Sequence, residues 1–283
     1  MTSAEEIQPA PEPPSRAGRN LPVAIATGLL LAGLIFLTLF TARPAFFVLV
    51  AAAVLTSQWE LYRAMRVHGS RASEVLGLSA GAIMLLGAYH RGPGALTFVL
   101  ALATVGTVLW FAVDPSQRDG APEGIASTLF GVAYVPFLGA HVVLMRNLPD
   151  GAAITISYLG LTAFYDIAAY ATGIAFGKHP LAPSVSPKKS WEGALGGTAF
   201  VVLVAAVAGP HIGPFTLGSA VALAGVTAFC APLGDLAESM LKRDMNVKDM
   251  GTLLPGHGGV LDRIDALLMC APAAYWLVRW LVS

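Results

Sequence analysis

The chain has 283 residues, of which 55% are hydrophobic and only 12% are charged, and its mean hydropathy is +0.68. In an ordinary soluble domain about a quarter of the residues are charged, so this composition excludes that class and indicates an integral membrane protein. The formal net charge is zero, which gives no overall basic surface for nucleic acid. Any partner must therefore be inferred from local charge.

Residues 1–20 are rich in Pro, Glu and Ala without apolar periodicity, so we expect a disordered tail. A helix that crosses a bilayer needs roughly twenty mostly apolar residues. The rest of the chain contains about nine such stretches, separated by turns with Gly and Pro. The predicted spans are 21–41, 44–63, 74–90, 94–113, 124–146, 152–175, 191–209, 216–239 and 259–281. This pattern predicts an all-α polytopic membrane protein, with five spans in residues 21–150 and four in residues 151–283.

The basic residues are distributed unevenly between the two sides of the predicted spans. Most Lys and Arg residues fall in the tail and the even-numbered loops, whereas the odd-numbered loops and the C-terminal end carry few. Loops rich in Lys and Arg stay on the cytoplasmic side of a membrane. The pattern predicts a cytoplasmic N-terminus, charged loops on the same side, and a C-terminus outside.

The first five spans contain few polar residues that suggest chemistry. Glu60 and Tyr62 follow Trp59 near the end of the second predicted span. Amphipathic side chains at helix ends anchor at the lipid headgroups, and we expect that role for these residues.

Residues 234–265 form a highly charged stretch, although apolar spans lie on both sides of it. Its ten charged residues are Asp235, Glu238, Lys242, Arg243, Asp244, Lys248, Asp249, Asp262, Arg263 and Asp265. Charge is costly near hydrocarbon, so ionisable residues gathered there indicate a functional site. A salt-bridged structural loop is the alternative, but ten charges exceed what packing alone requires.

The carboxylates in this stretch have helical spacing. Asp235 and Glu238 are three residues apart on the eighth predicted span, and Ser239 and Lys242 extend the same face. Two carboxylates at that spacing suit Mg²⁺, which binds through one or two carboxylates together with substrate phosphates. The following loop is expected to supply three cations, Lys242, Arg243 and Lys248.

A second carboxylate pair, Asp262 and Asp265, lies with Arg263 in the first turns of the ninth predicted span. The preceding glycines at 256, 258 and 259 permit backbone amides to approach an anion closely. The sequence therefore predicts an anion-binding turn at the start of this helix.

Two further motifs precede this region. Asp166 lies in the sixth predicted span, four residues before Tyr170, so both share a helix face; a helix-packing hydrogen bond is the alternative role for Asp166. The later run Ser186-Pro-Lys188-Lys189-Ser190 precedes a helix start, where hydroxyls and ammonium groups form a plausible anion cradle. A solvated cytoplasmic loop is the simpler interpretation of that run taken alone.

Carboxylates for a metal, cations for phosphate and a glycine turn at a helix start are the groups that phosphoryl or nucleotidyl transfer requires. The run over residues 239–265 resembles the signature of the phosphatidate cytidylyltransferases, the CDP-diacylglycerol synthases, throughout its length. Segments 166–170, 176–178, 186–193 and 234–239 resemble further motifs of that family. The resemblance is strong over roughly residues 150–270, whereas the first five spans match only in being apolar.

The resemblance implies transfer of CMP from CTP to phosphatidic acid, giving CDP-diacylglycerol and pyrophosphate in phospholipid biosynthesis. It implies a bacterial inner-membrane enzyme whose active site faces the cytoplasm, and a homodimer. On this interpretation the five N-terminal spans are a scaffold that shapes lipid access, and residues 151–283 are the catalytic region.

Roles for individual residues follow as hypotheses. Mg²⁺, with a second cation left open, is expected at Asp235 and Asp262, with Glu238 and Asp166 next in order. The catalytic set is Asp235, Asp262, Lys242 and Asp166. The substrate-binding set is Ser186, Lys188, Lys189, Ser239, Arg243, Lys248, His257, Gly258, Gly259 and Arg263.

Two alternatives remain open from the sequence. A CTP-dependent transferase or kinase acting on another membrane lipid would need a similar set of residues. A secondary transporter would use intramembrane charges to couple substrate and proton movement. Such proteins have broken helices at corresponding positions in both halves of the chain. In this sequence the charges gather in one half only, which favours the enzyme.

Overall fold

A computed structural model of the protein describes residues 21–113, 119–254 and 258–282. The predicted tail, residues 1–20, lies outside the described residues. In the described part, the helices are α1 (Leu21–Thr41), α2 (Arg43–Val67), α3 (Glu74–Arg91), α4 (Gly94–Val113), α5 (Ala121–Val132), α6 (Leu138–Asn147), α7 (Gly151–Phe176), α8 (Trp191–Ala208), α9 (Leu217–Asp244) and α10 (Leu261–Val282). A π-helical turn (Ala133–Phe137) joins α5 to α6, and a 3₁₀ turn (Gly209–His211) follows α8.

Seven helical stretches among the described residues are long and apolar enough to cross a membrane. They are α2, α4, the continuous stretch Ala121–Asn147, α7, α8 with its 3₁₀ turn, α9 and α10. Helix α1 is a shorter apolar helix over Ala26–Thr41, and α3 coincides with the third predicted span. The fold is therefore that of an all-α polytopic membrane protein, while the number of nine spans and the sides of the termini stay predictions.

Local sequence explains where several helices begin. Helix α2 has a proline in its first turn, where the missing backbone N–H has no helical partner to lose. Ser190 caps α8 by accepting a hydrogen bond from the Gly193 amide at 3.1 Å. Thr216 and Ser219 form a reciprocal capping box at the start of α9.

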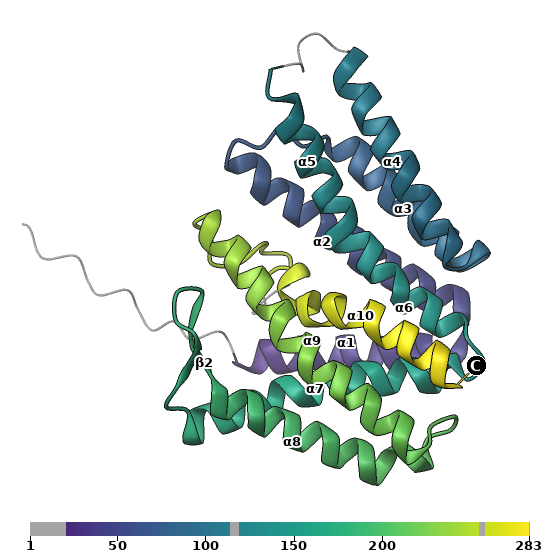
Figure 1. Ribbon diagram of the computed structural model, residues 1–283, viewed down its shortest axis with the longest axis vertical. Helices are drawn as coiled ribbons and strands as arrows, with labels where there is room; N and C mark the ends of the chain where they lie inside the picture. The colour runs from purple at the N-terminus through teal and green to yellow at the C-terminus, as the bar shows by residue number, and fades with distance from the viewer. Residues whose placement is uncertain (1–20, 114–118, 255–257, 283) are drawn as a thin grey trace, which may run out of the picture.

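Two predicted boundaries are wrong. Helix α9 continues to Asp244, five residues beyond the predicted limit, so Lys242 and Arg243 lie on its last turn and not in a loop. The predicted loop at Ser186–Ser190 is strand β2, paired antiparallel with β1 (Pro180–Ala182) in a hairpin between α7 and α8. An all-α description therefore misses one short hairpin, visible beside α8 in Figure 1.

Small residues allow the helices that carry the site to cross closely. A Cβ atom at Gly234 would lie only 2.6 Å from the Asp265 carbonyl oxygen, so α9 and α10 pack backbone against backbone at this point. The Tyr158 hydroxyl donates a 2.5 Å hydrogen bond to the Leu267 carbonyl and joins α7 to α10. In Figure 1, α7 to α10 lie together while α2 to α5 occupy the other end of the molecule.

The expected headgroup role of Glu60 and Tyr62 is wrong. Both side chains belong to a buried face of α2 and are 2% and 1% exposed, respectively. The Tyr62 hydroxyl donates to the Thr128 carbonyl at 2.6 Å, across to α5. Since α3, α5 and α10 pack around α2, its polar end lies inside the protein.

Candidate active site

Lys242 occupies the centre of a buried ionic network at the end of α9. Its Nζ contacts Glu238 one turn earlier and lies 2.9 Å from Asp262 Oδ1 on α10. The Lys242 side chain is 18% exposed, while those of Glu238 and Asp262 are 2% and 3% exposed. One cation thus holds together two carboxylates from two crossing helices.

Asp262 also organises the turn that precedes α10. Its carboxylate accepts hydrogen bonds from the Met250 amide at 3.0 Å and from the Gly259 amide at 2.8 Å. Gly258 has a φ of +83°, a backbone conformation that side chains with a Cβ rarely adopt. The described part of the predicted glycine turn, Gly258 and Gly259, is therefore folded around Asp262. The amides of Met250 and Gly259 are directed at a carboxylate of the protein itself.

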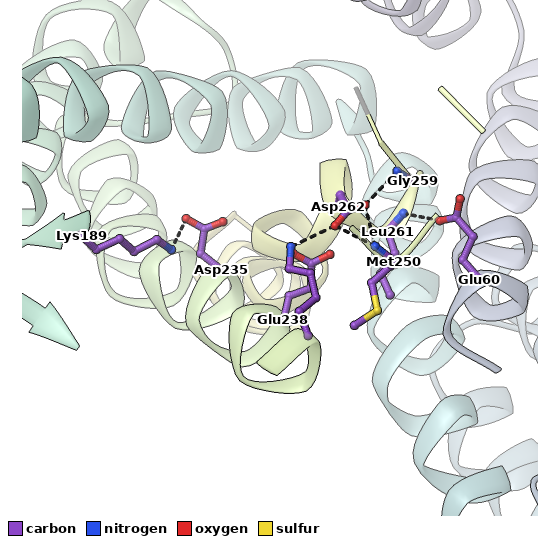
Figure 2. A network of polar contacts seen from close by, with 9 residues as sticks. Glu60, Lys189, Asp235, Glu238, Met250, Gly259, Leu261 and Asp262 are labelled. Carbon is purple, nitrogen blue, oxygen red and sulfur yellow. Dashed lines mark hydrogen bonds and ion pairs between the residues drawn. The ribbon is translucent and has the colours of Figure 1, made fainter. Parts of the chain in front are cut away.

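A second ionic group lies on the other side of Glu238 in Figure 2, where Lys189 of β2 reaches Asp235 of α9. The carboxyl of Asp265 lies against that of Asp235. These residues come from β2, α9 and α10, which meet at one end of the bundle. Asp235 and Glu238, three residues apart, therefore have different partners: Lys189 for one and Lys242 for the other.

A cavity of about 570 Å³ opens beside Asp235. Asp166 of α7 and Asp235 line it together with Lys188 and Lys189 of the hairpin. Tyr165, Ala169, Ile174 and Leu181 contribute an apolar wall. The cavity thus combines two carboxylates, two ammonium groups and a surface suited to hydrocarbon.

A smaller cavity of about 300 Å³ lies next to the first and shares Ser186 with it. Three cations from the end of α9 and the loop after it, Lys242, Arg243 and Lys248, line this cavity with Ser239. The Arg243 guanidinium donates to the Val185 carbonyl at 3.4 Å, which links α9 to the hairpin. This is the cationic cavity, and the larger one is the carboxylate cavity.

Glu192 lies within the segment 186–193, and the sequence did not predict a role for it. Its carboxylate accepts hydrogen bonds from the amides of Lys178 and His179 and contacts the His179 ring at 2.5 Å. These contacts fix the start of the hairpin to the first turn of α8. The hairpin in turn presents Lys188 and Lys189 to the carboxylate cavity.

The structure divides the predicted metal ligands between the two networks. Asp166 and Asp235 line one cavity, whereas Glu238 and Asp262 are paired with Lys242. Within residues 21–113, 119–254 and 258–282, no three His, Cys, Asp or Glu side chains gather at one point as a metal site would require. The carboxylate cavity nevertheless offers two carboxylates, Asp166 and Asp235. Mg²⁺ typically binds through one or two carboxylates when substrate phosphates and water supply its other ligands.

The remaining predicted residues have diverse positions. Gly259 is buried beside Asp262, whereas Arg263 is exposed on α10 and lines neither cavity. His257 lies outside the described residues.

Two residues of this region were missed as site residues: Asp265, which lies against Asp235, and Glu60, which accepts a hydrogen bond from the Leu261 amide.

Comparison with known proteins identifies the family. A sequence profile of the cytidylyltransferase family matches residues 22–281. The chain is 35% identical to the phosphatidate cytidylyltransferase of Mycobacterium leprae, over 94% of this chain and 90% of the relative. It is 34% identical to the phosphatidate cytidylyltransferase of Pseudomonas aeruginosa, over 90% of this chain and 97% of the relative. It is 41% identical to the chloroplastic phosphatidate cytidylyltransferase 4 of Arabidopsis thaliana, over 57% of this chain and 48% of the relative. Since the family profile spans nearly the whole chain, this protein belongs to the cytidylyltransferase family.

Proposed function

We propose that this protein transfers CMP from CTP to phosphatidic acid and releases CDP-diacylglycerol and pyrophosphate. The family and the names of its relatives support this reaction. The observation that carries it is the adjacency of the cationic and carboxylate cavities, which share Ser186 at one end of the helix bundle. Two polyanionic substrates can meet there with cations on both sides.

The cationic cavity is the proposed site of the CTP triphosphate. Arg243 offers a planar fork of donors that suits two phosphate oxygens, while Lys248 acts as a point charge. Lys242 uses two contacts for Glu238 and Asp262, and an ammonium has three N–H groups. Its third N–H is therefore available to a phosphate in the cavity that Lys242 lines.

The carboxylate cavity is the proposed site of the phosphatidic acid headgroup. Lys188 and Lys189 would neutralise the phosphate, and the apolar wall would accompany the first part of the acyl chains. In the reaction a phosphatidate oxygen forms a bond to the α-phosphorus of CTP while the bond to the β-phosphate oxygen breaks. Pyrophosphate leaves with that electron pair. A phosphate monoester is already ionised near pH 7, so no protein base is needed for the attack.

Mg²⁺ is the proposed cofactor, held by Asp235 and Asp166, which line the same cavity. When bound, the metal would reduce repulsion between the two substrates and stabilise charge on the departing pyrophosphate. Asp235 is also paired with a lysine, Lys189, but its side chain is 37% exposed and lines the cavity, whereas Glu238 and Asp262 are 2% and 3% exposed and both are engaged by Lys242. The buried pair is therefore less well supported as metal ligands. Their proposed part is to hold Lys242 at the border of the cationic cavity.

The distribution of Lys and Arg supports an active site on the cytoplasmic side of a bacterial inner membrane. The family resemblance also implies a homodimer, which sedimentation in detergent micelles would test.

The proposed reaction is tested with purified protein, radiolabelled CTP, Mg²⁺ and a panel of acceptor lipids. We expect the label to enter the lipid phase with phosphatidic acid and to remain in water with diacylglycerol or another lipid phosphate. Labelling of a different acceptor at a higher rate than phosphatidic acid would refute the proposed substrate.

A further inference from the structure

Glu60 is a buried carboxylate that reaches the active-site turn from the other half of the chain. It lies on α2, is 2% exposed, and its Oε2 accepts a 2.9 Å hydrogen bond from the Leu261 amide. The Val260 amide faces the same carboxylate. Figure 2 shows Glu60 and Asp262 on opposite sides of the chain that leads into α10.

The contacts of Glu60 suit the start of a helix. The first N–H groups of an α-helix have no partner within the helix, and a carboxylate placed there is also favoured by the helix dipole. Leu261 is the first residue of α10, so Glu60 satisfies a donor that would otherwise be buried and unpaired. A residue 201 positions away in the sequence thus fixes the first turn of α10.

The glycines of the turn leave space for this carboxylate. A Cβ atom at Gly259 would lie 2.7 Å from Glu60 Oε2 and 3.0 Å from Asp262 Oδ2, so the Gly259 backbone passes between the two carboxylates. A Cβ atom at Gly251 would collide with Glu60 Oε1. The turn is therefore clamped by Glu60 on one side and by Asp262 on the other, and Asp262 in turn contacts Lys242.

We propose that Glu60 is a positioning residue for the transfer reaction, which acts by accepting hydrogen bonds from the start of α10 and so holding Asp262 and Lys242 in register with the cationic cavity. The expected effect of Glu60 on kcat rests on the proposed function. Its expected effect on the turn rests on the hydrogen bonds and close contacts alone. It assigns the N-terminal helices a part in the active site beyond that of a scaffold.

The test compares three variants of the purified full chain. Glu60→Ala removes the acceptor, Glu60→Gln retains one acceptor oxygen, and Gln58→Ala is the control. Gln58 is also buried on α2, but its side-chain amide donates to the Gly77 carbonyl on α3. Among the described residues, Oε1 of Glu60 has no hydrogen-bond partner, so the amide nitrogen of glutamine can replace it without losing a contact seen there.

We expect Glu60→Ala to lower kcat by about tenfold or more, with a smaller change in the KM for CTP, because a misplaced turn weakens positioning more than binding. Amide hydrogen exchange over residues 249–254 and 258–261 should accelerate in the same variant. Glu60→Gln should stay within about threefold of the wild-type kcat. Gln58→Ala should leave the exchange of these segments unchanged.

Wild-type kcat and unchanged exchange in Glu60→Ala would overturn the inference, as would equal impairment of Glu60→Gln and Glu60→Ala. Acceleration of the same segments in Gln58→Ala would also overturn it. If Glu60→Ala does not fold, Glu60→Asp, whose carboxylate is withdrawn by one methylene, takes its place with the same expected changes and the same overturning result. Absence of CDP-diacylglycerol formation by the wild type would refute the proposed function instead, while hydrogen exchange would still test the role of Glu60.

Discussion

Replacing Lys242 by methionine should destabilise the protein strongly, because it leaves two buried carboxylates without their shared cation. Glu238 and Asp262 are 2% and 3% exposed at the side chain, and each contacts Lys242 Nζ. Removing one partner of a buried ion pair typically costs about 3–5 kcal/mol. We expect Lys242→Met to lower the free energy of unfolding by that amount, measured by reversible denaturation with SDS in detergent micelles and followed by tryptophan fluorescence.

A second substitution makes this prediction specific. Adding Glu238→Gln to Lys242→Met removes one of the two uncompensated charges, so the double variant should be more stable than Lys242→Met alone by about 1–3 kcal/mol. In the wild-type background, Glu238→Gln should destabilise, because it weakens the contact with Lys242. If the two substitutions were simply additive, the three side chains would not form one network and the reasoning would be refuted.

Three further predictions concern the proposed metal site, the cationic cavity and the turn at Gly258. Asp235→Asn and Asp166→Asn should each lower turnover by about tenfold or more and raise the Mg²⁺ concentration needed for half-maximal rate; near wild-type turnover at low Mg²⁺ would refute the metal assignment. Arg243→Ala and Lys248→Ala should each raise the KM for CTP by about tenfold, since each removes a charged phosphate contact, and an unchanged KM would count against a triphosphate in the cationic cavity. Gly258→Ala should cost about 1–2 kcal/mol of stability because φ is +83° and the new Cβ would lie 3.1 Å from Asp262 Oδ2; unchanged stability would contradict a rigid turn there.

Helical spacing correctly predicted where four carboxylates lie on their helices. Asp235 and Glu238, and likewise Asp262 and Asp265, lie three residues apart on helices, and the structure has each pair on its expected helix near the expected end. The partner of each carboxylate could not be predicted. It depends on how α9 and α10 cross at Gly234, which is a property of tertiary packing.

The hairpin shows why a local pattern can mislead. Lys188 and Lys189 lie in a short run with a proline, which lacks the apolar alternation that predicts a strand. Their strand forms because β1 pairs with it and because Glu192 anchors the chain before β1. Neither contact is visible from the run itself.

Glu60 illustrates a second limit. Its place between apolar residues and near Trp59 is typical of a helix end at the headgroups, and sequence alone favoured that position. What buries it is the packing of α2 against the start of α10, two hundred residues later in the chain, where unpaired amides need an acceptor. The signal in the sequence was a carboxylate inside a predicted membrane span.

The most direct test of the proposed reaction follows the separate phosphates of CTP. With Mg²⁺ and phosphatidic acid, CMP transfer should carry label from [α-³²P]CTP into the lipid and leave label from [γ-³²P]CTP in pyrophosphate. Lipid labelled from the γ-position and not from the α-position would identify a CTP-dependent kinase and contradict the proposal. If neither label enters the lipid and both are recovered as intact CTP, the proposal is contradicted as well.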